Sequence, residues 1–591
     1  MDTSGVVTRR RRPGLTVLRI GLVILLCMAV AAGTVGVLWQ RGMLSLAGRC
    51  LTSSTVTVVA SPTVEPALNQ VLAKWNATRP TVDGACVTAR TVVQESGQAA
   101  AAVGPGWDPA RDGDKPDVWV PDSSVWLSVA GSRPEAAELL GAQPESIATS
   151  PAVLALRKPM ATALGWPQRP LGRQDVIGAL SQPDVWAKAG HPEYASMRVG
   201  LTDPATSTAG LASVLSILDP TGTGEVGQQQ LIAGLQVSRV VGGFAPDAGV
   251  FFAAQSTAAA IDQNSAVAAF PALEKEVAEY NAANPAGEMA PVYDTQQSFV
   301  ADFPYVPLTA SWVSGRDRAA ADDIRQYLHG PDARAILARH YLRTPDGATD
   351  GTAALPVSAG YPAAPPAARA AITPERLSQV MAAWADLQRK VNLLVVLDTS
   401  GSMTKPVPDT KLNRLALLQQ TAGAGFNLLP HTMSIGLWEF SGRGDGQAHR
   451  ELVPFGPYPA NAGAIPRAQA LNQAVGALRA EGDTPLYDTV YDAFKTMQKQ
   501  WEAGSTNSVV IITDGANEVA TGLTLEQLTA KLAKEQIKDK PVQVVTIAVG
   551  PDADAASLEK VAAAAGGRNL VLREPASAIE TLVLAFTGRL Q

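Results

Sequence analysis

The chain has 591 residues, of which 46% are hydrophobic and 17% are charged, and its formal net charge is −6. These values are typical of globular domains, and they exclude a disordered acidic chain and a basic nucleic-acid-binding protein. Because 591 residues exceed what one hydrophobic core can organise, we expect about three or four globular units of roughly 100–200 residues each.

The N-terminus combines a basic tail, 1–19, with an apolar run that contains no charged residue between positions 20 and 39. About 20 apolar residues are enough to span a bilayer. Arginines at 9–12 and 19 precede this run, and such an excess of positive charge marks the cytoplasmic side. The sequence therefore predicts a transmembrane signal-anchor helix over 20–40 in a single-pass protein of the cell membrane. The bulk of the chain is then extracellular or periplasmic.

The alternative is a cleaved signal peptide, since Ala29, Ala31 and Ala32 offer a small-residue cleavage site. Either interpretation exports the rest of the chain. Cys27 lies inside the apolar run, so Cys50 and Cys86 are the exported pair of cysteines. An oxidising compartment permits a disulfide between them, and two separate thiols are the alternative.

The first exported region, 50–345, alternates between strand-like and helix-like patterns. The run 55–60 predicts a buried strand, and the spacing of apolar residues over 64–75 predicts a helix. Further strand-like runs occur at 118–120, 153–156 and 197–201. This alternation is typical of an α/β domain.

The composition changes over 346–373, where Ala, Pro and Gly dominate and no periodic apolar face is found. This segment predicts a surface linker. Thr373 and Pro374 then provide an N-cap and a first helical residue for a helix through 389. We assign this helix to the terminal domain, 374–591.

The terminal domain contains continuous apolar runs that predict strands, with helical patterns between them. The predicted strands are 393–397, 435–440, 509–512 and 542–549, and the predicted helices are 412–429 and 525–537. Strands this hydrophobic are covered on both faces, so we expect a doubly wound α/β sheet. Such sheets bind ligands at the carboxyl ends of their strands.

Asp398, Ser400 and Ser402 follow the first of these strands in a DxSxS pattern. One carboxylate and two hydroxyls are hard oxygen ligands, which suit Mg²⁺ or Mn²⁺, with Ca²⁺ as an alternative. A simple cap on the following helix is the other interpretation. Capping does not account for two later loops, which carry Thr484 and Asp514.

The DxSxS pattern resembles the metal-ion-dependent adhesion site of von Willebrand factor A domains, which have a Rossmann-like fold. The segment 482–487 (GDTPLY) looks like the second loop of that site, and 513–517 (TDGAN) looks like its third loop. The resemblance extends from about residue 391 to the C-terminus. By that match, Thr484 and Asp514 complete the set of metal ligands.

In that family, an acidic residue of a bound protein completes the coordination of the metal. The resemblance therefore implies metal-dependent protein binding or adhesion, with an unknown protein that carries such a residue as the partner. One departure concerns Glu481 and Asp483, whose carboxylates flank the second loop. These two charges favour a cation and oppose an acidic partner.

Residues 56–343 resemble bacterial extracellular solute-binding proteins, which have two lobes and a cleft. Chain order suggests that 152–268 forms the second lobe and that the chain returns to the first lobe at 271. The candidate ligand-binding residues follow strands or precede helices, where hydroxyls and free backbone amides bind anions or carboxylates. They are Ser61, Thr63, Asp122, Ser123, Ser150, Asp203, Ser207 and Thr208. Ordinary helix caps around a cleft without a ligand are the alternative.

No GxxxxGK[ST] loop and no GxSxG elbow occurs in the sequence, and the five histidines have no metal-ligand spacing. We therefore expect no enzyme activity. The leading interpretation is a membrane-anchored envelope protein that binds a protein partner through its metal site. The alternative is an extracellular solute receptor whose terminal domain relays the state of the cleft to a transporter or signalling partner.

Overall fold

The computed structural model describes residue 50 and residues 52–572 with short gaps. The gaps are 142–143, 223–225, 258–266, 295–296, 350–354, 409, 427–428, 430–432, 443–446, 459, 516, 520 and 551–552. The predicted transmembrane helix over 20–40, with Cys27, lies outside the described residues. Among the described residues, no helix combines the length and the apolar character needed to cross a membrane.

The first lobe is built on a six-stranded sheet in the order β2-β3-β1-β4-β12-β5. Its strands are β1 (Ser53–Ala60), β2 (Thr81–Val82), β3 (Ala85–Val93), β4 (Val118–Val120), β5 (Glu145–Ser146) and β12 (Pro304–Pro307). Its helices are α2 (Glu65–Ala77), α3 (Ser96–Ala102), α4 (Pro109–Asp112), α5 (Val125–Gly131), α6 (Pro134–Ala137), α14 (Gly315–Leu328) and α15 (Pro331–Arg339). Strands β3, β1 and β4 are parallel neighbours, so their carboxyl ends meet at one edge of the sheet.

The second lobe contains a sheet in the order β10-β6-β9-β7-β8, and β11 also pairs with β6. Its strands are β6 (Ser150–Arg157), β7 (Arg198–Thr202), β8 (Val241–Ala245), β9 (Val267–Leu273), β10 (Met289–Val292) and β11 (Val300–Ala301). Its helices are α7 (Lys158–Ala163), α8 (Arg173–Ser181), α9 (Pro183–Lys188), α10 (Thr208–Leu218), α11 (Gln228–Val240), α12 (Ala248–Thr257) and α13 (Glu274–Ala283). Strands β7, β8 and β9 run parallel to one another.

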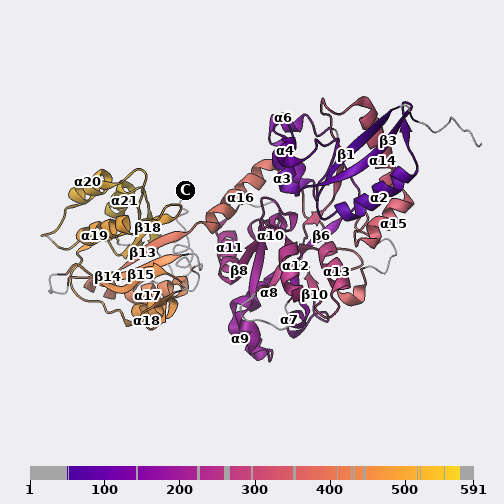
Figure 1. The fold of residues 1–591 in the computed structure, drawn as a ribbon. Coiled ribbons are helices and arrows are strands. Elements are labelled where there is room, and N and C mark those ends of the chain that lie inside the picture. The colour runs from indigo at the N-terminus through magenta and orange to yellow at the C-terminus, as the bar shows by residue number, and fades with distance from the viewer. Residues whose placement is uncertain are drawn as a thin grey trace, which may run out of the picture.

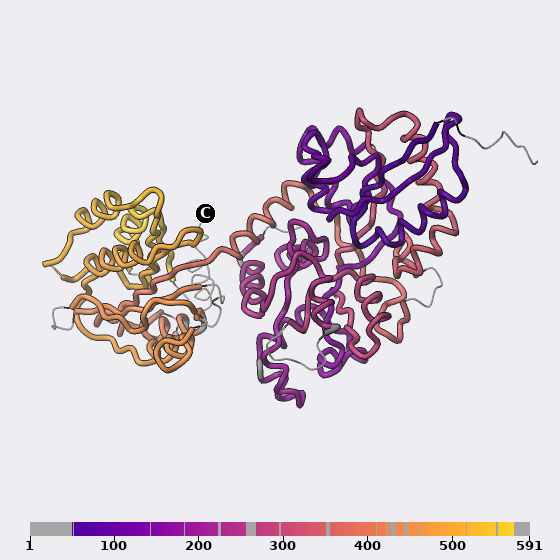
Figure 2. Tube along the Cα trace, in the orientation of Figure 1, coloured from indigo at the N-terminus to yellow at the C-terminus, as the bar shows by residue number. Residues whose placement is uncertain are grey.

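The chain returns to the first lobe later than the sequence suggests. We predicted a return at residue 271, but β9 pairs with both β6 and β7, and β10 pairs with β6. The apolar run of β9 is therefore buried inside the second sheet. The first return strand is β12, which pairs with β4. Figure 2 shows this later part of the chain beside the indigo N-terminal part.

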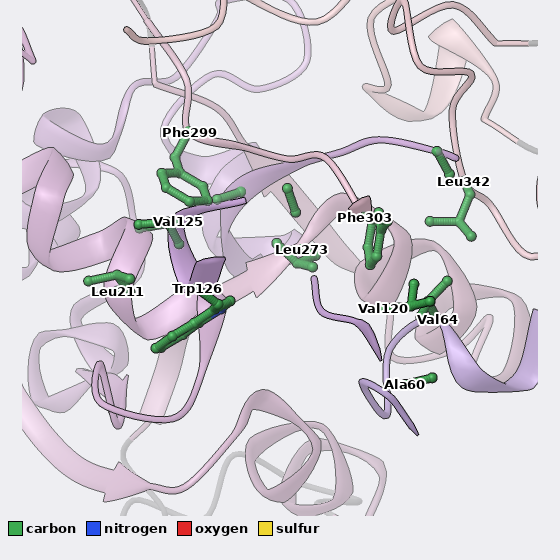
Figure 3. Close-up of a cluster of buried hydrophobic side chains, with 14 of the residues drawn as sticks. Ala60, Val64, Val120, Val125, Trp126, Leu211, Leu273, Phe299, Phe303 and Leu342 are labelled. Atoms are coloured by element: carbon green, nitrogen blue, oxygen red, sulfur yellow. The ribbon is translucent and has the colours of Figure 1, made fainter. Parts of the chain in front are cut away.

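The two lobes share one apolar core, which includes residues from both sheets and from α16 (Pro374–Gln388). Figure 3 shows part of it, where Trp126 of α5 in the first lobe lies near Leu211 of α10 in the second. Both side chains are almost fully buried. Contacts of this kind make the two-lobed region one packed unit.

Part of the segment 346–373 differs from the predicted surface linker. Ser298 exchanges two backbone hydrogen bonds with it, donating to the carbonyl of Ala367 and accepting from the amide of Arg369, both at 2.9 Å. The side chains of Leu355 and Tyr361 are buried. The proline-rich segment lacks a periodic apolar face, but part of its backbone forms hydrogen bonds with the second lobe.

Helix α16 begins where the sequence predicts, and the hydroxyl of Thr373 accepts a hydrogen bond from the amide of Arg376. Its apolar face packs on α10 and α11 of the second lobe. The buried residues of this face are Leu377, Val380, Trp384 and Leu387. The sequence grouped this helix with the terminal domain, whereas its packing joins it to the two-lobed region (Figure 1).

Asp219, at the C-terminal end of α10, holds the beginning of α16. Its carboxylate, only 2% exposed, accepts hydrogen bonds from Arg369 at 2.9 Å and from Arg376 at 2.8 and 2.9 Å. A buried carboxylate is costly without partners of opposite charge. The two arginines therefore tie the end of the segment 346–373 and α16 to α10.

The terminal domain is a six-stranded sheet in the order β15-β14-β13-β18-β19-β20. Its strands are β13 (Val391–Asp398), β14 (Ser434–Phe440), β15 (His449–Pro457), β18 (Thr506–Thr513), β19 (Gln543–Val549) and β20 (Asn569–Leu572), and β16 (Asn461–Ala462) pairs with β17 (Ile465–Pro466) apart from it. Its helices are α17 (Arg414–Phe426), α18 (Arg467–Ala477), α19 (Leu486–Lys499), α20 (Leu525–Glu535) and α21 (Ala555–Ala564). Alternate residues of β13 enter two separate apolar clusters, so both faces of the sheet are covered. The predicted doubly wound α/β fold is confirmed.

The predicted disulfide between Cys50 and Cys86 is present, with the two Cα atoms 5.3 Å apart. It closes a separation of 36 residues. Cys86 is also the register partner of Ser53 in the pairing of β1 with β3. The bond therefore links the entrances of two neighbouring parallel strands.

A buried ion pair joins the two-lobed region to the chain that follows α15. The guanidinium of Arg343 donates to both carboxylate oxygens of Glu274, at 2.6 and 2.7 Å, and neither side chain is exposed. It also donates to the carbonyls of Gly347 and Pro362. Glu274 accepts a further hydrogen bond from the hydroxyl of Tyr293. Every charged group in this pair is therefore compensated.

We expect Arg343→Met to lower the free energy of unfolding by about 3–5 kcal/mol, because it leaves Glu274 buried without its counter-charge. Urea unfolding of the full chain measures this loss. The control is Arg325→Met, which breaks an ion pair of exposed side chains with Glu145 and is expected to cost about 0–1 kcal/mol. Equal costs for the two variants would contradict the assignment.

Candidate functional site

The first predicted metal-binding loop follows β13, the strand that lies between β14 and β18 in the terminal sheet. Asp398 is fully buried there. One of its carboxylate oxygens accepts from the amide of Ser400 at 2.8 Å, and the other accepts from the hydroxyl of Thr513. The hydroxyl oxygens of Ser400 and Ser402 lie 2.9 Å apart. The loop thus brings one carboxylate and two hydroxyls together.

The second loop is tied to the first by backbone hydrogen bonds in both directions. The amide of Gly401 donates to the carbonyl of Gly482 at 2.9 Å, and the amide of Glu481 donates to the carbonyl of Thr399 at 2.8 Å. Thr484 is fully buried in this loop. Its placement follows from these bonds rather than from any regular element.

The third loop joins the other two. Thr513, at the end of β18, donates to the carboxylate of Asp398, which links this loop to the first. The amide of Glu518 donates to the carbonyl of Thr484 at 3.1 Å, and the hydroxyl of Thr484 donates to the carboxylate of Glu518 at 3.2 Å. Three loops distant in sequence therefore meet at one edge of the sheet.

Asp514 has an unexpected partner in this third loop. Its Oδ2 atom accepts from the guanidinium of Arg414 at 2.6 Å, and both side chains are buried. Its Oδ1 atom is also buried and has no hydrogen-bond partner among the described residues. Burial raises the pKa of Asp398 to about 6, and the charge of Asp514 adds to that rise. The site thus holds two buried carboxylates close together, with Arg414 beside one of them.

These residues fit a hard divalent cation by the chemistry of their donor atoms. They offer carboxylate and hydroxyl oxygens, and Asp514 Oδ1 is a buried acceptor without a donor. In the described part of the chain, no group of three or more His, Cys, Asp or Glu side chains could hold a metal. That result agrees with a donor set in which hydroxyls outnumber carboxylates. Glu481 and Asp483 are exposed beside the second loop.

A second candidate site is a cavity of about 270 Å³ between the two lobes. It lies where the carboxyl ends of parallel strands from both sheets face each other. Four of the residues that the sequence predicted line it, namely Thr63, Asp122, Ser207 and Thr208. Ser207 also caps α10, since its hydroxyl accepts from the amide of Gly210.

The other four predicted residues do not line this cavity. Ser61 is buried next to it, and Ser123 accepts a hydrogen bond from the amide of Val125. Ser150 accepts from the amide of Lys275 at 3.1 Å. Asp203 is exposed and accepts from a backbone amide two residues later. For Ser123 and Asp203, the hydrogen bonds are those of ordinary local turns, whereas Ser150 binds the distant first turn of α13.

Sequence reasoning missed the charged residues of the cavity. They are Glu95, Asp247, Lys275, Glu276 and Glu279. Glu95, Asp247 and the residues of α13 come shortly after the ends of β3, β8 and β9. The rule that ligands bind at the carboxyl ends of parallel strands would have found them, had those strands been recognised.

The two lobes touch directly at this cavity. The hydroxyl of Thr208 donates to Asp122 Oδ2 at 3.0 Å and accepts from the indole of Trp126 at 2.7 Å. Gly97 approaches the opposite lobe so closely that a Cβ atom there would lie 2.1 Å from the carbonyl oxygen of Ala205. Only glycine fits at that point of contact.

Burial raises the pKa values of several cavity carboxyls. Desolvation, with the nearby charges of Asp122 and Asp247, raises the pKa of Glu95 to about 7. Desolvation also raises the pKa of Glu276 to about 7. The pKa of Asp122 is raised as well, again mainly by burial, although neighbouring hydroxyls oppose the rise. For Glu276, the charge of Lys275 opposes the rise without cancelling it.

Because the pKa of Glu95 is raised from 4.5 to about 7 in the folded state, the stability of the protein depends on pH in this range. Between those values the folded protein holds a proton that the unfolded chain releases, so the free energy of unfolding falls as the pH rises. We expect Glu95→Gln to flatten this fall in urea unfolding between about pH 5 and pH 8. The exposed Glu135→Gln is the control. An unchanged slope in Glu95→Gln would contradict the expected pKa.

Comparisons with known proteins identify both parts of the chain. Residues 56–343 match the family of bacterial extracellular solute-binding proteins, and residues 392–583 match the von Willebrand factor type A domain. The chain therefore contains an extracellular solute-binding domain followed by a von Willebrand factor A domain. Both domain families noted in the sequence are confirmed, and the metal-ion-dependent adhesion site stays a prediction.

Similar proteins are found among curated sequences and among solved structures. An uncharacterised protein of Mycobacterium tuberculosis is 26% identical over 587 residues, which cover 94% of this chain and 81% of that protein. A periplasmic thiamin-binding protein is 12% identical, with a TM-score of 0.40, over 58% of this chain and 98% of that one. A von Willebrand factor type A protein from Catenulispora acidiphila is 22% identical, with a TM-score of 0.27, over 34% of this chain and 42% of that one.

Proposed function

We propose that this protein is anchored in the cell membrane by residues 20–40 and binds a partner protein through a divalent metal held by its von Willebrand factor A domain. The observation that carries the proposal is the meeting of three loops around Asp398. Hydrogen bonds connect each loop to another, so the predicted ligands are held by a common framework. Both domains belong to binding families.

The proposed ligands are Asp398, Ser400, Ser402, Thr484 and Asp514. A bound Mg²⁺ or Mn²⁺ supplies a coordination position that a carboxylate of the partner can take. Asp398 contributes the most deeply buried charge, and the amide of Ser400 and the hydroxyl of Thr513 fix its orientation. Arg414 holds one oxygen of Asp514, and the other has no donor among the residues that the structure describes.

The exposed carboxylates of Glu481 and Asp483 influence which partner protein can bind, because their negative charges repel an acidic group. An acidic group approaching without a metal meets their negative charge, so the affinity for such a partner depends on the cation. This arrangement favours a partner whose binding is lost when the metal is removed. Ca²⁺ is an alternative to Mg²⁺ and Mn²⁺, because its oxygen ligands are of the same kind.

We expect Asp398→Asn in the full chain to weaken Mn²⁺ binding by about 100-fold or more, because the amide removes the central charge of the site. Calorimetric titration measures the affinity. Asp483→Asn is the matched control, since it removes an exposed carboxylate of the second loop, and we expect its affinity within about threefold of the unaltered chain.

The same variants test partner binding. The immobilised full chain is exposed to envelope extract in Mg²⁺ or in chelator, and the retained proteins are compared. The proposal requires retention that disappears with chelator and with Asp398→Asn but persists with Asp483→Asn. A pattern of retention that neither chelator nor Asp398→Asn alters would reject metal-dependent binding.

A second candidate function is a solute receptor whose terminal domain responds to the cleft. One observation favours it. Helix α10 has Thr208 at the interlobe cavity, and Asp219 at its other end binds Arg376 of α16. Helix α16 ends at Gln388, close in sequence to the start of β13, whose last residue is Asp398. A displacement of α10 is thereby passed to the strand that carries the metal loop.

We expect Arg376→Gln to lower the free energy of unfolding by about 1–3 kcal/mol, because it removes one of the two arginines that bind the buried carboxylate of Asp219. In a receptor, this variant also uncouples the two domains. Hydrogen exchange in the loop after β13, with and without a cleft ligand, measures the coupling. Arg389→Gln, which breaks an exposed pair with Asp386 just after the same helix, is the control. Equal responses in both variants would exclude this route.

A further inference from the structure

We propose that the cavity between the two lobes binds a small organic cation, an amine or guanidinium compound, rather than the anion or carboxylate that the sequence suggested. The proposal rests on the solute-binding part of the proposed function and assigns a ligand class to it. It does not depend on the metal site of the von Willebrand factor A domain.

The lining of the cavity is predominantly acidic. Five carboxyl groups line the cavity, two from the first lobe and three from the second, and these are Glu95, Asp122, Asp247, Glu276 and Glu279. Among the described lining residues, Lys275 is the sole positively charged one. Its ammonium group lies 2.6 Å from Glu279 and is buried, so its charge is already used within α13. An anion in this cavity would meet net repulsion.

Asp122 has a buried oxygen atom that accepts no hydrogen bond from the described residues, and this observation does not depend on how many charges line the cavity. This side chain is 4% exposed and borders the cavity. Its Oδ2 atom accepts from Thr208, but its Oδ1 atom is buried without a hydrogen-bond partner among the described residues. Native proteins rarely leave such an atom unsatisfied. A donor with positive charge is the ligand group that satisfies it best.

The arrangement of the carboxyl groups favours an organic cation over a metal ion. In the described part of the chain, no set of three or more acidic, His or Cys side chains converges closely enough to hold a metal. The cavity wall also includes apolar surface from Pro62, Ala248 and Leu273. Spread-out carboxylates with apolar surface between them suit a molecule whose charged ends are separated by carbon atoms.

The size of the cavity agrees with this class. At about 30 Å³ for each molecule of liquid water, its volume of about 270 Å³ corresponds to roughly nine waters. A short diamine or agmatine fits within this volume together with a few water molecules. Carboxylates from both lobes then bind opposite ends of one ligand, which offsets the repulsion between the lobes.

Calorimetric titration of the full chain tests the proposal with three groups of probes. These are organic cations (putrescine, agmatine and spermidine), divalent metal ions (Mg²⁺ and Mn²⁺) and anions (sulfate, molybdate and acetate). The variants are Asp122→Asn and Glu95→Gln. Asp203→Asn is the matched control, because this carboxylate lies near the start of α10 but outside the cavity. Thermal unfolding verifies that each variant folds.

We expect at least one organic cation to bind, and each cavity variant to weaken it by about tenfold or more, while Asp203→Asn leaves it unchanged. Glu95 is partly exposed, so Glu95→Gln keeps the test valid if Asp122→Asn fails to fold. Binding that Asp203→Asn weakens as much as the cavity variants do would overturn the proposal.

The remaining outcomes also decide the question. Binding of anions alone, or of metal ions alone, would overturn the ligand class while leaving solute binding intact. Heat from metal ions that Asp398→Asn abolishes belongs to the other domain and does not count as support. Silence from every organic cation would overturn the proposal. None of these results affects metal-dependent retention of a partner, which is measured separately.

Discussion

A single buried carboxylate, that of Asp219, holds α16, the helix that precedes the terminal domain, against α10 of the second lobe. Arg369 and Arg376 approach it from the end of the proline-rich segment and from α16, and the loss of both would leave its charge uncompensated in an apolar interior. Helix α16 therefore behaves as part of the solute-binding domain although it directly precedes β13. The terminal domain thus follows a helix that is packed on the second lobe, and the loop with Asp398 lies at the far end of the first strand after that helix.

The features that the sequence predicted well depend on local patterns. The apolar runs of β13 and β18 mark central strands, since strands covered on both faces consist almost entirely of hydrophobic residues. The DxSxS residues are adjacent in the chain, so their placement after β13 follows from the strand itself. Thr373 was recognisable as a helix cap for the same reason, because its role involves only the next three residues.

The features that the sequence missed depend on contacts between distant residues. Nothing near Asp514 in the sequence indicates that the guanidinium of Arg414 lies 2.6 Å from its carboxylate. That contact depends on the tertiary packing by which α17 and β18 contribute to one apolar cluster. The acidic lining of the cavity arises in the same way, since Glu95 and Asp247 come from different lobes. The sequence did not predict the late return to the first lobe at β12, because the apolar run of β9 fits a buried strand in either sheet.

The bond between Cys50 and Cys86 has a mechanical consequence for a chain tethered at its N-terminus. Tension applied to residue 50 from outside the domain does not act on β1 alone, because the covalent link transmits it to β3 at the same level of the sheet. Two parallel strands then share the load, and β1 cannot be unzipped from its end one hydrogen bond at a time. If the N-terminal segment is anchored as proposed, the disulfide lies at the point where that tension enters the domain.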